Sequence, residues 1–126
     1  MKIDICEKSF SPWALLQEYE QEVLDPLYAG QYGAATVFSG TMREFNEGDG
    51  VTGMLLEHYP GMTDRYLEKI SAEAAARWEL LDTLIVHRVG LMMPNDPIVL
   101  VAAWSAHRGE AFEAARYLIE ALKSRA

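Results

Sequence analysis

The stretch IVLVAAWSAHRG, residues 98–109, decides the fold. Residues 98–104 are almost wholly apolar, which is typical of a strand buried in the middle of a sheet. The short segment Ser105–Arg108 follows, and a helical pattern then runs from about Gly109 to Arg125. The apolar residues of that pattern are expected to face the core: Phe112, Ala115, Leu118, Ile119 and Leu122. The sequence therefore predicts a central strand that passes directly into a C-terminal helix.

An N-terminal helix and two strands are expected before this segment. Ser11-Pro12 has the form of an N-cap followed by a proline in the first turn. We expect the helix to stop at Asp25-Pro26, because apolar residues recur at helical spacing up to that point: Trp13, Leu16, Tyr19 and Val23. Residues 34–39 and 51–58 are rich in β-forming types, and the polar, glycine-bearing stretch 43–50 suits a mobile loop between paired strands.

The middle of the chain adds another helix and strand. Thr63 or Asp64 can cap a helix whose apolar stripe consists of Leu67, Ile70, Ala74 and Trp78. Residues 84–89 form a third strand. Because the strands are grouped between helices without regular β–α–β alternation, the pattern favours an α+β fold with a mixed or antiparallel sheet and about three helices. We expect residues 1–126 to form a single domain.

The composition is typical of a globular protein of the cytoplasm. Hydrophobic residues make up 50% and charged residues 24% of the chain. Cys6 is the only cysteine, so no internal disulfide and no CxxC motif can form. Asp4 stands where a signal peptide needs an apolar run, and no stretch approaches the ~18 apolar residues of a membrane span. We expect a soluble cytoplasmic protein that does not associate with membranes.

The charge balance makes the few cations informative. The formal net charge is −8, from 11 Lys and Arg against 19 Asp and Glu. We expect no nucleic-acid partner, because a net anion repels the phosphate backbone and no basic stripe with interleaved aromatic residues overrides that repulsion. A site for an anionic substrate would have to concentrate its cations locally. The candidates are Arg43, His107, Arg108 and Lys123.

Each candidate cation also has a simpler structural explanation. His107 and Arg108 stand where a helix begins, and the first N–H groups of a helix bind anions readily. Alternatively, Ser105 caps the helix and both side chains are merely solvated. Arg43 opens a glycine-bearing loop and alone would be a surface arginine. Lys123 lies near the end of the last helix, where a cation suits the helix dipole.

Metal binding and several common catalytic motifs have no support in the sequence. His58, His87 and His107 lie far apart without HxH or HExxH spacing, so we expect no metal site. His87 and Arg88 alternate across a strand, so at most one of them faces any given site. The sequence contains no glycine-rich phosphate loop and no GxSxG motif.

The spacing of the cations favours a shared site. Arg108 and Lys123 stand at opposite ends of one predicted helix, ~22 Å apart along its axis at a rise of ~1.5 Å per residue. A small substrate would be stretched to meet both. A pocket that uses all four cations is more easily assembled from two copies of the chain, so we expect a symmetric homodimer with sites at or near its interface.

Five stretches between Gly33 and Arg125 resemble the large, catalytic subunit of molybdopterin synthase. They are, in order, ATVFSGTMRE, LLEHYPGM, ARW, IVHRVG and SAHRGEAFEAARYLIEALKSRA. Each stretch alone is a weak signal, but five in the right order at compatible spacings make a specific match. The N-terminal helix region is less diagnostic.

The resemblance implies a fold, a partner and a reaction. The fold is an α/β-hammerhead type of α+β fold, and the assembly is a heterotetramer in which a central homodimer is flanked by two copies of a small ubiquitin-like sulfur-carrier subunit. The family converts cyclic pyranopterin monophosphate (precursor Z) into the dithiolene molybdopterin. The implied enzyme binds no cofactor, because its sulfur is supplied by the thiocarboxylate at the small subunit's C-terminal Gly-Gly, which threads into the large subunit's pocket.

The resemblance also assigns roles to residues. His107 and Arg108 match contacts to the phosphate and the pterin that the neighbouring subunit supplies. Lys123 matches a catalytic lysine, where a cation can hold the thiocarboxylate and assist proton transfer as oxygen is displaced. Other substrate-binding and pocket-lining positions are implied within one stretch of chain: Phe38, Thr41, Met42 and Arg43.

The end of the sequence departs from the family pattern. The family continues past the last helix into a segment with proline, aromatic residues and a second functional lysine, whereas this sequence ends at Ala126. Three explanations are open: the tail is omitted here, the protein was truncated, or this member lacks that lysine. We favour an omitted tail that orders when the partner docks. Two other classes of function stay open: a pterin- or nucleotide-binding module without chemistry, and a purely structural dimer.

Overall fold

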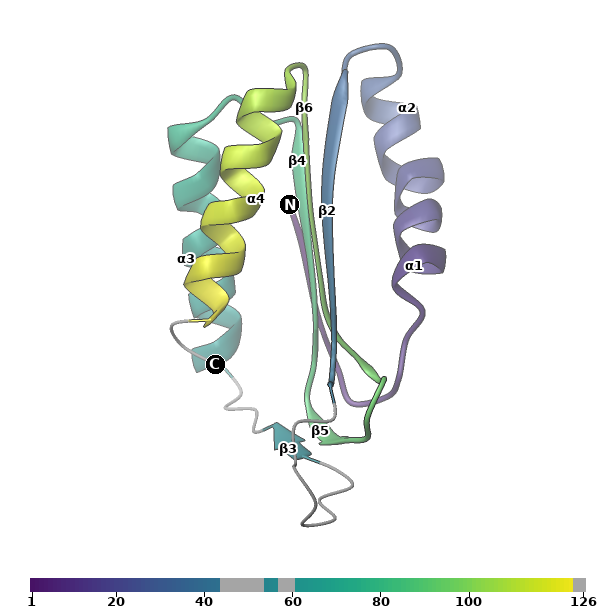
Figure 1. Ribbon diagram of the computed structural model, residues 1–126. Coiled ribbons are helices and arrows are strands. Elements are labelled where there is room, and N and C mark those ends of the chain that lie inside the picture. Colours follow the sequence, from purple (N-terminus) through teal and green to yellow (C-terminus); the bar gives the residue numbers. More distant parts are fainter. Residues whose placement is uncertain (44–53, 57–60, 124–126) are drawn as a thin grey trace.

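A four-stranded sheet lies between two helical layers in the computed structural model, which describes residues 1–43, 54–56 and 61–123 (Figure 1). The strands of this sheet are β1 (Lys2–Cys6), β2 (Ala34–Thr41), β4 (Asp82–Arg88) and β6 (Pro97–Ser105). Their order is β1-β4-β6-β2. β1 runs parallel to β4, and the other neighbours are antiparallel. The sheet is therefore mixed, as the sequence predicts.

Helices cover both faces of the sheet (Figure 1). On one face, α1 (Pro12–Tyr19), the π-helical turn η1 (Glu20–Leu24) and α2 (Asp25–Tyr28) follow one another without a break. On the other face lie α3 (Met62–Arg77) and α4 (Arg108–Lys123). The expected α+β class with about three helices is confirmed. Within the described ranges, no helix combines the length and the apolar character that crossing a membrane requires.

The predicted central strand is confirmed as β6. Leu100, Ala102 and Trp104 pack with the core on the α1 side, while Val101 and Ala103 belong to the clusters on the α3 and α4 side. Because helices cover both faces of the sheet, the side chains from Leu100 to Trp104 are buried on both faces, whereas Ile98 and Val99 are half-buried. This arrangement explains why residues 98–104 form a continuous apolar run instead of an alternating one.

The predicted pairing of the strands on either side of residue 43 is wrong. β2 pairs with β6, whereas β3 (Met54–Leu56) pairs with β5 (Gly90–Met92) in a separate two-stranded sheet. β-rich composition indicates a strand but does not choose its partner. Most of the predicted loop 43–50, and the remainder of the predicted strand 51–58, lie outside the described residues.

The predicted stop of the N-terminal helix at Asp25-Pro26 is also wrong, because the helical path continues to Tyr28. In η1 the Asp25 N–H donates to the carbonyl of Glu20, and Pro26 then falls in the first turn of α2, where a missing N–H costs little. Trp13 does not join the predicted apolar stripe, since 61% of its surface is exposed. Tyr19 of that stripe is buried.

The other two helices follow their predicted stripes with specific exceptions. Leu67, Ile70 and Ala74 of α3 are buried as predicted, but the N-cap position is Gly61, at φ +85°, and not Thr63 or Asp64. In α4, Ala115 and Leu118 are buried as predicted, whereas Phe112 is 60% exposed. Ala111 and Ala114 occupy the buried positions instead of Phe112, because successive helical residues point about 100° apart.

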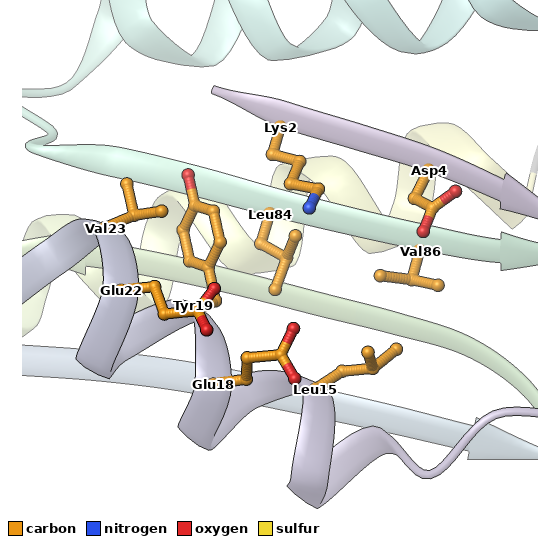
Figure 2. Close-up of a pocket in the computed structure, with 9 residues that line it drawn as sticks. All are labelled: Lys2, Asp4, Leu15, Glu18, Tyr19, Glu22, Val23, Leu84 and Val86. Carbon is orange, nitrogen blue, oxygen red and sulfur yellow. The ribbon is translucent and has the colours of Figure 1, made fainter.

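One edge strand was not predicted from the sequence. β1 alternates along KIDIC, and its Ile3 and Ile5 pack into the cluster formed with α3 and α4. The opposite side of β1 carries Lys2 and Asp4 toward α1 (Figure 2). This alternation is the usual signal of a half-buried strand.

Candidate functional site

A groove lies between the C-terminal part of α4 and the sheet face that α4 covers. Its volume is about 290 Å³. We call it the α4 groove, and its lining residues come from three strands (β2, β4 and β6) and from α4: Phe38, Gly40, His87, Ile98, Val99, Val101, Ile119, Leu122 and Lys123. Two of the residues expected at the site, Phe38 and Lys123, are therefore brought together by the fold.

Strand register explains why these residues meet. Phe38 is paired with Val101, Gly40 with Val99, and Val99 with His87, so all five occupy neighbouring positions on one face. Gly40 helps to keep this face open. A Cβ at Gly40 would lie 3.1 Å from Val99 Cγ1 and 3.2 Å from the ring of Phe38.

The α4 groove combines apolar walls with few polar side chains. Its polar side chains are His87 from β4 and Lys123 from the last turn of α4, and Phe38 on its wall is 38% exposed. Lys123 is exposed, so the attraction between its ammonium group and an anion would be strengthened by a bound ligand that covers it and excludes water. The groove is thus suited to hold an extended, mostly apolar ligand with a negative group near Lys123.

His87 was not singled out as a site residue from the sequence, but the alternation prediction around it is confirmed. His87 lines the α4 groove, while Arg88 is buried and turned to structural contacts. The Arg88 side chain donates hydrogen bonds to the carbonyls of Glu7 and Leu91. The choice between the two residues follows from which face of the sheet is covered by α4, which packs on β6 and β2.

The segment just before Arg43 is anchored by two backbone hydrogen bonds. It lies at the end of β2, close in sequence to the groove residue Gly40. The Met42 N–H donates to the Asp96 carbonyl at 2.8 Å, and the Asn95 N–H donates to the Met42 carbonyl at 2.7 Å. The Met42 side chain is only 3% exposed, whereas Thr41 and Arg43 on either side are exposed. Met42 therefore acts as an anchor, and its neighbours face solvent.

His107 and Arg108 lie at the other end of α4. Both are exposed, and neither side chain makes a hydrogen bond or ion pair with another residue of the described ranges. The Ser105 hydroxyl accepts a hydrogen bond from the His107 N–H at 3.3 Å. Since α4 is one unbroken 16-residue helix between Arg108 and Lys123, the ~22 Å separation stands. One chain therefore holds Arg108 and Lys123 at opposite ends of α4 (Figure 1).

Comparison with known proteins decides the family. The model of the family described as MoaE protein matches residues 11–125. The chain belongs to the MoaE family.

Several relatives of this MoaE-family chain are described as molybdopterin synthase catalytic subunits. A molybdopterin synthase catalytic subunit of Pseudomonas aeruginosa is 50% identical over 128 residues, which cover 100% of this chain and 80% of that protein. One of Ralstonia nicotianae is 53% identical over 96 residues, but the match covers 76% of this chain and only 54% of that protein. The chain thus spans about half the length of the Ralstonia relative.

Solved structures agree with this family and with the α+β fold. A molybdopterin biosynthesis MoaE protein from Burkholderia ambifaria superposes with a TM-score of 0.80 at 41% identity, covering 97% of this chain and 76% of that one. A molybdopterin synthase from Staphylococcus aureus superposes with a TM-score of 0.80 at 31% identity, covering 98% of this chain and 85% of that one.

A second cavity in this MoaE-family chain is a poor candidate for an anion site. It lies on the α1 side of the sheet, has a volume of about 50 Å³, and is lined in part by Asp4, Glu18, Glu22 and Lys2 (Figure 2). That space is enough for a few water molecules at ~10–15 Å³ each, but not for a pterin. Its three carboxylates also repel an anion.

The described residues offer no metal centre. In those ranges, no three His, Cys, Asp or Glu side chains gather closely enough to hold an ion. His58 lies outside the described residues. The candidate chemistry of this MoaE-family chain rests on Lys123 and His87 in the α4 groove and on His107 and Arg108 at the other end of α4.

Proposed function

We propose that this chain is the catalytic subunit of a molybdopterin synthase, a sulfur transferase of molybdenum cofactor biosynthesis in the cytoplasm. Its substrate is cyclic pyranopterin monophosphate (precursor Z), and its product carries the dithiolene of molybdopterin. The single observation that carries the proposal is the placement of Lys123 in the α4 groove beside Phe38 and His87. The family and its molybdopterin synthase relatives support the same conclusion.

The α4 groove fits the entry of a partner's C-terminal tail. A glycine tail has no side chains, so it can lie between apolar walls where a bulkier chain would clash. Gly40 leaves the floor of the groove open near Val99. The proposed partner is a small ubiquitin-like sulfur-carrier subunit whose C-terminal thiocarboxylate reaches Lys123, so that sulfur arrives with the partner and not with a bound cofactor.

Lys123 has a defined role in this reaction. Its ammonium group attracts the negatively charged thiocarboxylate and holds the sulfur against the pterin side chain. As the bond between the sulfur and the pterin side-chain carbon forms, the bond from that carbon to oxygen breaks, and the ammonium group can donate the proton that the leaving oxygen needs. The small subunit is then joined to the sulfur as an acyl thioester, and water breaks that acyl carbon–sulfur bond, which releases the small subunit with an ordinary carboxylate and leaves the sulfur on the pterin. His87 lines the same groove and is a second polar side chain there.

The phosphate and pterin of the substrate would be bound by cations. His107 and Arg108 are exposed and uncommitted to other described residues, so they are available to an anion. Because they stand at the far end of α4 from Lys123, we propose that the neighbouring protomer of a homodimer supplies them, with Arg43, Thr41 and the Met42 segment completing the pocket. Two small subunits would then make a heterotetramer.

Reconstitution tests this proposal. The chain is mixed with precursor Z and a thiocarboxylated small subunit, and the pterin product is analysed for sulfur. We expect dithiolene formation, and no product from a matched control in which the small subunit ends in an ordinary carboxylate. Substrate binding without sulfur transfer would instead identify a pterin-binding module, and no affinity for precursor Z would leave a structural dimer.

A further inference from the structure

We infer that Gly33 and Ser105 are positioning residues that fix the turn presenting His107 and Arg108 to the substrate. We call Ser105–Arg108 the 105–108 turn. The inference rests on the proposed function of that turn as an anion-binding element. Neither Gly33 nor Ser105 itself touches the substrate in this arrangement.

Gly33 holds the turn by leaving room for it. Its N–H donates a hydrogen bond of 3.0 Å to the Ser105 carbonyl, just before β2 begins. A Cβ at Gly33 would lie 2.5 Å from the Ala106 carbonyl oxygen and 3.5 Å from the carbonyl carbon. The obstacle is backbone, so it cannot rotate away as a side chain would. Any side chain at Gly33 must therefore displace the turn.

Ser105 ties the turn to a third part of the fold. Its side chain is fully buried, and its hydroxyl donates to the Glu79 carbonyl at 2.7 Å while accepting from the His107 N–H at 3.3 Å. The Glu79 backbone is also bound from α4, because a Glu110 carboxylate oxygen accepts a hydrogen bond from the Glu79 N–H at 2.5 Å. The turn is thus fixed both by the chain before β2 and by the chain between α3 and β4.

The two cations on this fixed turn contrast with its backbone. The side chains of His107 and Arg108 are exposed, and neither makes a hydrogen bond or ion pair with another described residue. A fixed backbone that carries uncommitted side chains reduces the ordering that binding requires. Displacement of the turn by about 1 Å would misalign charge-assisted hydrogen bonds to a phosphate. Lys123, at the other end of α4, would keep its place.

The test separates substrate binding from chemistry. Gly33→Ala is assayed in the complete enzyme with thiocarboxylated small subunit and varied precursor Z. We expect KM for precursor Z to rise about tenfold, while kcat at saturating substrate stays within about twofold, because an interaction with the bound substrate is weakened and the reacting group is unmoved. The matched control is Gly109→Ala, whose added Cβ meets nothing within 4 Å, and its KM is expected to stay unchanged.

A second variant covers the case in which Gly33→Ala does not fold. Ser105→Ala removes the hydroxyl that joins Glu79 to His107 without adding atoms, and we expect the same rise in KM. An unchanged KM in the folded variants, or a loss confined to kcat, overturns the inference. His107→Ala and Arg108→Ala distinguish a failure of the positioning role from a failure of the proposed substrate-binding role. If they raise KM while Gly33→Ala and Ser105→Ala do not, positioning alone is wrong; if they also leave KM unchanged, the proposed role of the turn fails.

Discussion

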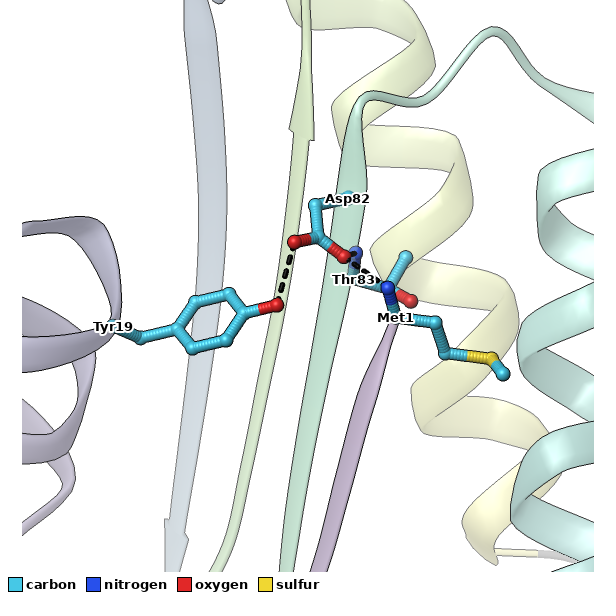
Figure 3. A network of polar contacts seen from close by, with 4 residues as sticks. All are labelled: Met1, Tyr19, Asp82 and Thr83. Carbon is cyan, nitrogen blue, oxygen red and sulfur yellow. Dashed lines mark hydrogen bonds and ion pairs between the residues drawn. The ribbon is translucent and has the colours of Figure 1, made fainter. Parts of the chain in front are cut away.

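The hydroxyl of Tyr19 donates a hydrogen bond of 2.5 Å to the carboxylate of Asp82, which lies 63 residues further along the chain (Figure 3). The second oxygen of Asp82 accepts from the Thr83 N–H at 2.8 Å and pairs with the amino group of Met1. Tyr19 is 7% and Asp82 8% exposed. This contact joins α1 to the start of β4 and so connects one helical layer to the sheet.

Replacing Tyr19 with phenylalanine should destabilise the fold by about 1–3 kcal/mol, because Asp82 loses a donor in a buried place. Urea unfolding followed by circular dichroism measures the change. The matched control is Tyr32→Phe, since Tyr32 donates to Asp25 at 2.7 Å in an exposed setting and its loss should cost less. Equal effects of the two substitutions would contradict the importance of burial.

Stability should fall on the alkaline side because of the same contact. Burial raises the pKa of Tyr19 above the ordinary value of 10.0, and the hydrogen bond to Asp82 raises it further. Above about pH 10 an unfolded tyrosine loses its proton while folded Tyr19 keeps it, so the unfolded state is favoured. The contribution is therefore complete below pH 10 and is lost as pH rises. Unfolding free energies measured from pH 8 to 11 should decline less steeply in Tyr19→Phe than in the unaltered protein.

Replacing Lys123 with alanine should abolish sulfur transfer but leave precursor Z bound. Loss of a proton donor and charge at the reacting centre lowers the rate by about 10²–10⁴-fold. Single-turnover assays measure transfer, and calorimetric titration measures affinity. Lys69→Ala on the exposed side of α3 is the control and should behave as the unaltered enzyme does. Undiminished transfer by Lys123→Ala would remove this lysine from the chemistry.

Replacing Arg108 with alanine should weaken precursor Z binding. Each charge-assisted hydrogen bond that is lost costs about 1.5–3 kcal/mol, or about 10- to 150-fold in Kd. Arg116→Ala provides a control for loss of one positive charge, because Arg116 is an exposed arginine of the same helix. If both variants bind with unaltered affinity, Arg108 does not belong to the site.

The parts of the fold that the sequence predicts are those governed by local periodicity. β6 is evident because burial on both faces leaves an apolar run. The burial of Phe112 was predicted wrongly, because a large apolar residue was assumed to face inward, whereas α4 turns Ala111 and Ala114 to the core. The π-helical turn before Pro26 depends on a shift in backbone hydrogen bonding that side-chain pattern does not show.

The site shows where sequence reasoning needs tertiary structure. Phe38 and Lys123 meet because of the register between β2 and β6 and the length of α4. Alternation indicates that only one of His87 and Arg88 faces a site. The packing of α4 on β6, the strand beside β4, decides which one does. No local pattern shows that position 33 needs glycine. The atom that a side chain at Gly33 would meet is the carbonyl oxygen of Ala106, 73 residues further along the chain.

The assembly of the chain can be tested through Arg108 and Lys123, which occupy opposite ends of α4. If each site combines Lys123 of one protomer with Arg108 of the other, the chain should sediment as a dimer at micromolar concentration. The inactive Lys123→Ala protein and the Arg108→Ala protein should then complement each other after mixing and exchange. Half of the resulting dimers are mixed and each has one intact site, so about a quarter of the sites should recover. A monomer with full substrate affinity, or mixing that restores no activity despite exchange, would show that each chain builds its site alone.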